Sequence, residues 1–150
     1  MSIKIFTNSP SQTKKVGEIL AKEILKTKTR NSILICLKGQ LGSGKTTFLQ
    51  GFARGLKIKK RILSPTFVLL KRFPLKNENF ENFYHIDCYR IKKAKEILNL
   101  GLFQILKNKK NILAIEWANK IKKVIKQRAL WLTFKIRGDK KREIEVQWKS

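Results

Sequence analysis

Residues Gly39 to Thr46 read G-Q-L-G-S-G-K-T and satisfy the pattern G-x-x-x-x-G-K-S/T in full. Glycines in this pattern let the chain turn tightly and bring consecutive backbone N–H groups onto phosphate oxygens. Lys45 has the charge to neutralise the terminal phosphates of a nucleotide, and the Thr46 hydroxyl has the chemistry to bind Mg²⁺. The pattern therefore predicts a phosphate-binding loop that holds Mg-ATP.

The flanking sequence supports this prediction. Ser32–Leu37 is a short, continuous apolar run, as expected of a strand buried on both faces, and an amphipathic helix is predicted from near Lys45 to about Gly55. A strand, a glycine-rich loop and a helix N-terminus make the context that the motif requires, which disfavours a turn without function. The predicted nucleotide-binding residues in this loop are Gly39, Leu41, Gly42, Ser43, Gly44, Lys45, Thr46 and Thr47, and Lys45 is also expected to act in catalysis.

Hydrolysis of ATP also requires a carboxylate near the metal and a group that positions the attacking water. Between Ile97 and Gly138 the only acidic residue is Glu116, which follows the apolar residues of the predicted strand Asn111–Trp117. The C-terminal edge of a parallel sheet faces the ligand crevice in open α/β folds. Glu116 is therefore predicted to bind the metal, with an ordinary strand-end glutamate as the alternative.

Three more polar residues are candidates for the site. Asp87 is one of only two aspartates and lies at the end of the predicted strand Phe80–Tyr89. A buried carboxylate there needs a metal or a hydrogen-bond donor, which favours a functional role over a turn or cap. Thr66 has a hydroxyl suited to a γ-phosphate or its Mg²⁺, although its spacing alone favours an ordinary turn. His85, the sole histidine, is interpreted as a packed strand residue.

The remaining patterns predict the elements that position these residues. Ser9 is predicted to cap a helix that starts at Pro10, with Gln12 completing a capping box. Buried strands alternating with helices predict an α/β, P-loop NTPase-type three-layer domain over residues 1–150, with a mostly parallel central sheet plus antiparallel strands. Further predicted elements are a strand at 4–6, a strand at 66–73 before a turn at 76–79, short helices within 92–107 broken at Gly101, and a hairpin of strands 130–137 and 143–148.

The composition is strongly basic. The 35 lysines and arginines against 10 acidic residues give a net charge of +25, and only eight of the basic residues are arginines. Such a charge attracts acidic partners or nucleic acid, but compositional drift toward lysine explains it equally well. No apolar run approaches the roughly 18 residues needed to cross a bilayer, and the first ten residues lack signal-peptide features. A cytoplasmic protein without membrane contact is expected.

Taken in order, these motifs resemble the bacterial TsaE (YjeE) family, the small ATPase of tRNA threonylcarbamoyladenosine biosynthesis. The matching segments are Gly39–Thr47, Ser64–Phe67, His85–Arg90, Gly101–Leu102 and Ile115–Trp117, and the resemblance spans nearly the whole chain. It implies binding of ATP or ADP with Mg²⁺ and weak ATPase activity without partners. It also implies partnership with the TsaB and TsaD proteins, with the threonylcarbamoyl transfer itself belonging to TsaD.

By matching position, the resemblance implies a role for individual residues. Thr46 and Glu116 become Mg²⁺ ligands, and Asp87 becomes a catalytic carboxylate that either contacts the metal or positions water. Thr66 becomes a switch-like threonine that assists catalysis. The remaining implied residues are Ser9 and Arg142, which frame the adenine end.

Two positions depart from the family's pattern, because Gln40 and Asn119 replace residues that are usually acidic.

Two other functions stay open. A small P-loop kinase acting on a metabolite would carry an arginine-rich lid, which eight arginines make hard to build. A basic nucleic-acid-binding module with a vestigial loop would bind RNA in a steeply salt-dependent way. A tRNA-facing basic surface is also compatible with the ATPase.

Overall fold

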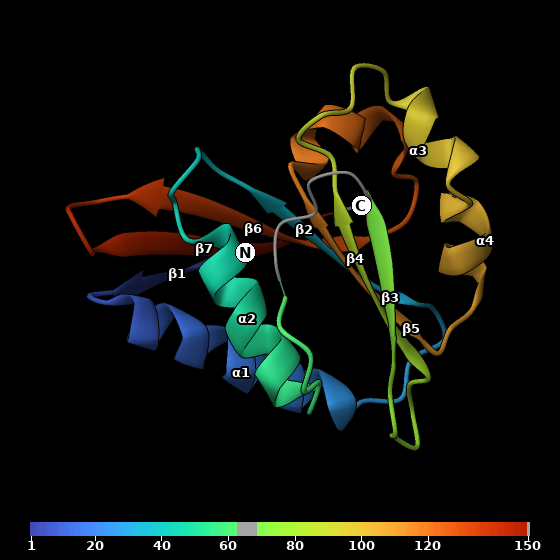
Figure 1. Ribbon diagram of the computed structural model, residues 1–150, viewed down its shortest axis with the longest axis horizontal. Helices are drawn as coiled ribbons and strands as arrows, with labels where there is room; N and C mark the ends of the chain where they lie inside the picture. Colours follow the sequence, from blue (N-terminus) through green and yellow to red (C-terminus); the bar gives the residue numbers. More distant parts are fainter. Residues whose placement is uncertain (63–68, 150) are drawn as a thin grey trace.

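The structure of the chain, a computed structural model, describes residues 1–62 and 69–149. Within them, seven strands form one sheet in the order β1-β7-β6-β2-β5-β4-β3 (Figure 1). The strands are β1 (Ser2–Thr7), β2 (Ile33–Lys38), β3 (Leu70–Pro74), β4 (Asn82–Asp87), β5 (Asn111–Glu116), β6 (Ala129–Ile136) and β7 (Arg142–Lys149). The helices are α1 (Pro10–Leu25), α2 (Lys45–Gly55), α3 (Lys95–Asn99), α4 (Leu102–Lys107) and the 3₁₀ helix η1 (Ala118–Val124).

The middle of the sheet is parallel and its two sides are antiparallel. Strands β6, β2, β5 and β4 run parallel to one another, whereas β1 and β7, β7 and β6, and β3 and β4 pair antiparallel. The two central strands, β2 and β5, are the continuous apolar runs of the sequence, as parallel strands buried on both faces require. The predicted parallel centre with added antiparallel strands is confirmed.

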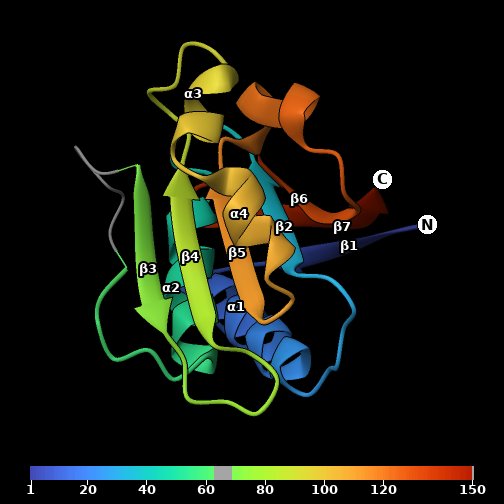
Figure 2. The same cartoon turned by 90° about the vertical axis from the view of Figure 1, so that its right-hand side faces the viewer.

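Side chains of the central strands alternate between two separate cores. On β2, Ile35 and Leu37 pack in the core beneath α1 and α2, whereas Leu34 and Cys36 pack in the core beneath α3, α4 and η1. Figures 1 and 2 show the corresponding layers, with α1 and α2 on one face of the sheet and α3 and α4 on the other. Each polar side chain on a central strand therefore faces one helical layer or the other.

Most predicted elements agree with the structure, with shifted ends. The Ser9 hydroxyl accepts a hydrogen bond from Gln12 N at 3.2 Å, which confirms the cap of α1. The predicted break in the 92–107 region is also confirmed, because Gly101 adopts φ +86° between α3 and α4. Residues 66–68 of the predicted strand 66–73 lie outside the described residues, and β3 begins at Leu70. The 3₁₀ helix η1 was not predicted.

Helices α1 and α2 approach each other closely enough for their backbones to touch. A Cβ atom added at Gly51 of α2 would lie 1.9 Å from the Lys14 carbonyl oxygen of α1. A Cβ added at Gly17 of α1 would lie 2.2 Å from the Phe48 carbonyl oxygen of α2. Glycine is therefore required at both crossing points, and this contact fixes α2 and the loop that precedes it.

Across the described part of the chain, no helix has the length and apolar character to cross a membrane.

Gly51→Ala is expected to lower the free energy of unfolding by about 1–3 kcal/mol, because the added methyl group overlaps the Lys14 carbonyl. Gly138→Ala serves as the control, since the nearest atom to an added Cβ there lies 3.5 Å away, on Lys141. The control is expected to stay within about 1 kcal/mol of wild type. Urea unfolding followed by circular dichroism measures both, and equal effects would contradict the close contact.

Candidate functional site

The loop between β2 and α2 is shaped by its glycines. Gly42 and Gly44 have φ angles of +77° and +103°, which side chains other than glycine rarely adopt. A Cβ atom added at Gly39 would lie 2.7 Å from the Phe134 carbonyl oxygen of β6. Helix α2 begins directly after this loop at Lys45, so the positive end of its helix dipole faces the loop.

Lys45 is held inside the loop. Its Nζ donates hydrogen bonds to the carbonyl oxygens of Gly39 at 2.6 Å and Gln40 at 3.0 Å, and it lies 4.3 Å from the ring centroid of Trp117. The residue is only 5% exposed. Burial lowers the pKa of Lys45, while the Glu116 carboxylate opposes that shift. The ammonium group is thus positioned among acceptors that a phosphate could replace.

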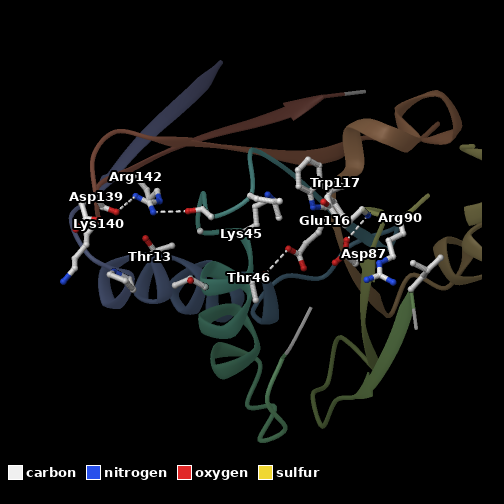
Figure 3. A pocket seen from close by; sticks show the side chains of 17 residues that line it. Thr13, Lys45, Thr46, Asp87, Arg90, Glu116, Trp117, Asp139, Lys140 and Arg142 are labelled. Carbon is white, nitrogen blue, oxygen red and sulfur yellow. Dashed lines mark hydrogen bonds between the residues drawn. The ribbon is translucent and has the colours of Figure 1, made fainter. Parts of the chain in front are cut away.

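Thr46, one residue further along α2, contacts the end of β5. Its Oγ1 donates a hydrogen bond to Glu116 Oε1 at 3.2 Å (Figure 3). The β4–β5 register places Asp87 opposite Glu116, at the C-terminal ends of the two parallel strands. The structure therefore brings together the three residues predicted as metal ligands, as expected for polar residues at the carboxyl edge of a parallel sheet.

Asp87 is buried, with 7% of its surface exposed. Its Oδ1 accepts a hydrogen bond from Tyr89 N at 2.9 Å. Burial raises the pKa of Asp87, and the neighbouring Glu116 carboxylate raises it further, whereas the bond from Tyr89 N lowers it. Two carboxylates kept close together in a buried position are a site at which a cation would be stabilised.

The donor set suits Mg²⁺ bound together with a phosphate. Among the described residues, no group of three or more His, Cys, Asp or Glu side chains forms a metal cage. Mg²⁺ rarely needs such a cage, because it keeps several waters and binds through one or two carboxylates plus substrate phosphates. Glu116, Asp87 and the Thr46 hydroxyl supply hard oxygen donors of this kind.

These groups face a cavity of about 410 Å³ (Figure 3). Its walls come from the loop and start of α2, the N-terminus of α1, the ends of β4 and β5, and the turn between β6 and β7. The lining residues are Pro10, Thr13, Leu41, Gly42, Gly44, Lys45, Thr46, Thr47, Leu69, Asp87, Tyr89, Arg90, Glu116, Trp117, Asp139, Lys140 and Arg142. Segments distant in sequence thus converge on the loop.

Arg142 ties the tip of the loop to the β6–β7 turn. Its Nη2 donates to the Gly42 carbonyl oxygen at 2.9 Å, and its Nη1 donates to the carbonyl oxygens of Gly138 at 3.0 Å and Asp139 at 3.1 Å. The guanidinium therefore braces both sides of the cavity at the end away from Glu116, as Figure 3 shows. Arg142 lines the cavity, and its predicted contact with the adenine end of a nucleotide stays a prediction.

The other predicted residues divide into three groups. Leu41, Gly42, Gly44, Thr46 and Thr47 line the cavity with Lys45, whereas Gly39 and Ser43 belong to the loop without being among its lining residues. Ser9 is also absent from the described lining, and its hydroxyl caps α1. Thr66 lies outside the described residues.

Sequence reasoning missed several lining residues, namely Thr13, Tyr89, Arg90, Asp139 and Lys140. Thr13 lies one helical turn beyond the recognised Ser9 cap, and its hydroxyl shares a 2.8 Å hydrogen bond with the hydroxyl of Thr7. Tyr89 and Arg90 belong to the motif His85–Arg90 around Asp87, and that motif could have identified them as site residues. The turn residues carry no comparable pattern, because only the tertiary fold brings them to the loop.

Comparison with known proteins assigns the family. Residues 7–144 match the sequence model of "Threonylcarbamoyl adenosine biosynthesis protein TsaE". The chain belongs to the TsaE family. The tRNA threonylcarbamoyladenosine biosynthesis protein TsaE of Bacillus subtilis (strain 168) is 34% identical over 142 residues, which cover 95% of this chain and 83% of that protein. The TsaE protein of Rickettsia typhi is 35% identical over 141 residues, which cover 93% and 91%.

A solved structure supports the same assignment. The crystal structure of Bacillus subtilis YdiB superposes with a TM-score of 0.74 at 31% identity, covering 97% of this chain and 84% of that one. The resemblance to the TsaE family noted in the motifs is therefore confirmed.

A second cavity, of about 650 Å³, adjoins the first across Trp117 and Tyr89. Both residues line both cavities, and their rings lie in tilted contact, with centroids 5.2 Å apart and an interplanar angle of 47°. Trp117 has a φ angle of +59°, which turns the chain sharply after β5. Gln40 and Asn119, the two positions at which the motifs depart from the resemblance, both line this second cavity. The two departures therefore fall on one surface, outside the donor set of Thr46, Asp87 and Glu116.

Asp87→Asn is expected to raise the melting temperature at pH 7 in metal-free buffer. The folded protein holds the Asp87 proton more tightly than the unfolded chain, so the ionised carboxylate lowers stability above its folded pKa. The gain in melting temperature over wild type should shrink as the pH falls through the folded pKa of Asp87 toward 3.8, the ordinary pKa of an aspartate. Asp139→Asn alters the other, exposed aspartate and should change little. A lower melting temperature for Asp87→Asn across this range would contradict the burial penalty.

Proposed function

We propose that the chain is a Mg²⁺-dependent ATPase of tRNA threonylcarbamoyladenosine biosynthesis, acting in the cytoplasm with the TsaB and TsaD proteins. The observation that carries the proposal is the convergence of the loop, Lys45, Thr46, Asp87 and Glu116 on one cavity. A P-loop NTPase requires these same parts: a loop for phosphates, a lysine, a metal-binding hydroxyl and a carboxylate at the adjacent strand end.

The cavity suits a nucleotide in size and in chemistry. Its volume of about 410 Å³ falls within the range of about 300–1,000 Å³ typical of small-molecule sites. The phosphates are assigned to the loop, where backbone N–H groups and Lys45 supply positive charge. The adenosine is assigned to the other end, between Thr13 of α1 and Arg142 and Lys140 of the β6–β7 turn. Ser9 supports this end indirectly, by capping the helix that presents Thr13.

The metal is assigned to Thr46 and Glu116. Their hydrogen-bonded oxygens are 3.2 Å apart, and Asp87 is the register partner of Glu116. When bound, Mg²⁺ would offset the negative charge of the terminal phosphates. Asp87 would bind this ion directly or orient the attacking water, and Thr66 is proposed as a switch threonine beside the same phosphates.

The assignment to the tRNA pathway is supported by the family that the chain belongs to, whose description names threonylcarbamoyl adenosine biosynthesis. Following the resemblance of the motifs to that family, we assign the transfer to TsaD and an ATP-driven conformational step to this chain. Its net charge of +25 would favour contact with tRNA or with acidic surfaces of its partners.

The test is Mg²⁺-dependent ATP hydrolysis, measured alone and with a TsaB–TsaD pair. We expect the pair to stimulate turnover, and Lys45→Ala and Glu116→Ala each to lower the stimulated rate by about 100-fold. The first variant removes a cation at the phosphates, and the second removes a proposed ligand of the Mg²⁺ that offsets their charge. Lys109→Ala is the matched control, because this exposed lysine precedes β5, at the opposite end of the strand from Glu116.

Turnover that the pair does not change, with both variants equal to wild type, would contradict the proposal. A phosphorylated metabolite as product would favour a kinase instead. RNA binding that falls steeply with salt and ignores Lys45→Ala, without any ATP hydrolysis, would favour a nucleic-acid-binding module.

A further inference from the structure

His85 contacts the central carboxylate of the site rather than serving only as packing. Its side chain lies on β4 and is 1% exposed, and its Nε2 lies 2.7 Å from Glu116 Oε2. Glu116 is almost equally buried, at 3%. A carboxylate oxygen only accepts hydrogen bonds, so Nε2 carries the proton and donates it. The sole histidine of the chain thus donates its hydrogen bond to Glu116, the residue assigned to the metal.

Strand register explains how these two side chains meet. His85 pairs with Ala114 on β5, two residues before Glu116, so His85 and Glu116 are diagonal neighbours. Side chains at Phe83 and Ile112, which share this alternation, pack in the core beneath α1 and α2. His85 therefore lies on the same face of the sheet as Glu116, and the small side chain of Ala114 between them leaves room for the contact.

The two oxygens of Glu116 are held by donors from different elements. Oε1 accepts from Thr46 at the start of α2, and Oε2 contacts His85 on β4. Without the imidazole, one buried oxygen would lose its donor and the carboxylate would be free to rotate about its terminal bond. Groups that hold a metal-binding carboxylate in this way typically change metal affinity by about 10–100-fold when they are removed.

We propose that His85 is a positioning residue, which holds Oε2 of Glu116 so that Oε1 stays directed at Thr46 and the cation. This inference rests on the proposed Mg-ATP site, because it assigns His85 a function through Glu116. His85 is not among the described residues that line the cavity, so the proposal gives it no direct contact with the nucleotide. The expected signature is a loss of metal affinity without a loss of metal-free nucleotide affinity.

The test compares His85→Gln with His85→Asn. Both introduce an amide, but the glutamine N–H reaches near the position of Nε2, whereas the shorter asparagine does not. Mn²⁺ affinity is measured by electron paramagnetic resonance in the presence of a non-hydrolysable ATP analogue, and analogue affinity is measured separately with EDTA. We expect His85→Asn to weaken Mn²⁺ binding by about 10–100-fold and His85→Gln to restore most of it. Neither variant should change analogue binding in EDTA.

A second measurement needs no substitution. Because the chain has one histidine, ¹⁵N-histidine labelling gives signals from His85 alone. We expect a protonated Nε2 whose resonance moves when Mg²⁺ is added to analogue-loaded protein. An Nε2 without a proton, or a resonance that Mg²⁺ leaves in place, would overturn the inference even if a variant failed to fold.

The outcomes separate this inference from the proposed function. Wild-type protein that binds no Mn²⁺ with the analogue would overturn both. Wild-type Mn²⁺ affinity in His85→Asn, or equal losses in the asparagine and glutamine variants, would overturn the role of His85 alone.

Discussion

The hydrogen bond from Thr46 to Glu116 joins the first turn of α2 to the end of β5 at 3.2 Å. It depends on two constraints from distant parts of the chain. Glycines at the α1–α2 crossing bring the helix backbones into contact and fix where α2 begins. Parallel pairing of β2 with β5 places the end of β5 beside the loop that leaves β2. A shift in either would separate the hydroxyl from the carboxylate.

Burial of polar side chains is the common feature of the groups around this bond. Lys45, Asp87, His85 and Glu116 are each less than a tenth exposed, and each has a partner that limits the cost of burial. The fold thus positions one ammonium group and two carboxylates before any ligand arrives. Such preorganisation is what phosphoryl chemistry requires of a protein, because its contribution is positioning and electrostatic stabilisation.

The sequence allowed prediction wherever a local pattern has a direct physical consequence. The loop motif predicted the start of α2, the Ser9 cap predicted the start of α1, and apolar runs identified β2 and β5. Features that depend on tertiary register were missed. The lysine-rich segment of η1 has no clear helical periodicity, the β6–β7 turn reaches the loop only through the order of strands, and the contact of His85 with Glu116 follows from the β4–β5 register.

The central claim is that Thr46 and Glu116 hold a divalent cation against phosphates bound in the loop. Crystals grown with Mn²⁺ and a non-hydrolysable ATP analogue test it most directly, through anomalous diffraction from the metal. The account predicts one anomalous peak within bonding distance of Thr46 Oγ1 and Glu116 Oε1, with the terminal phosphates at Lys45. A nucleotide bound elsewhere, or Mn²⁺ bound away from both oxygens, would contradict it.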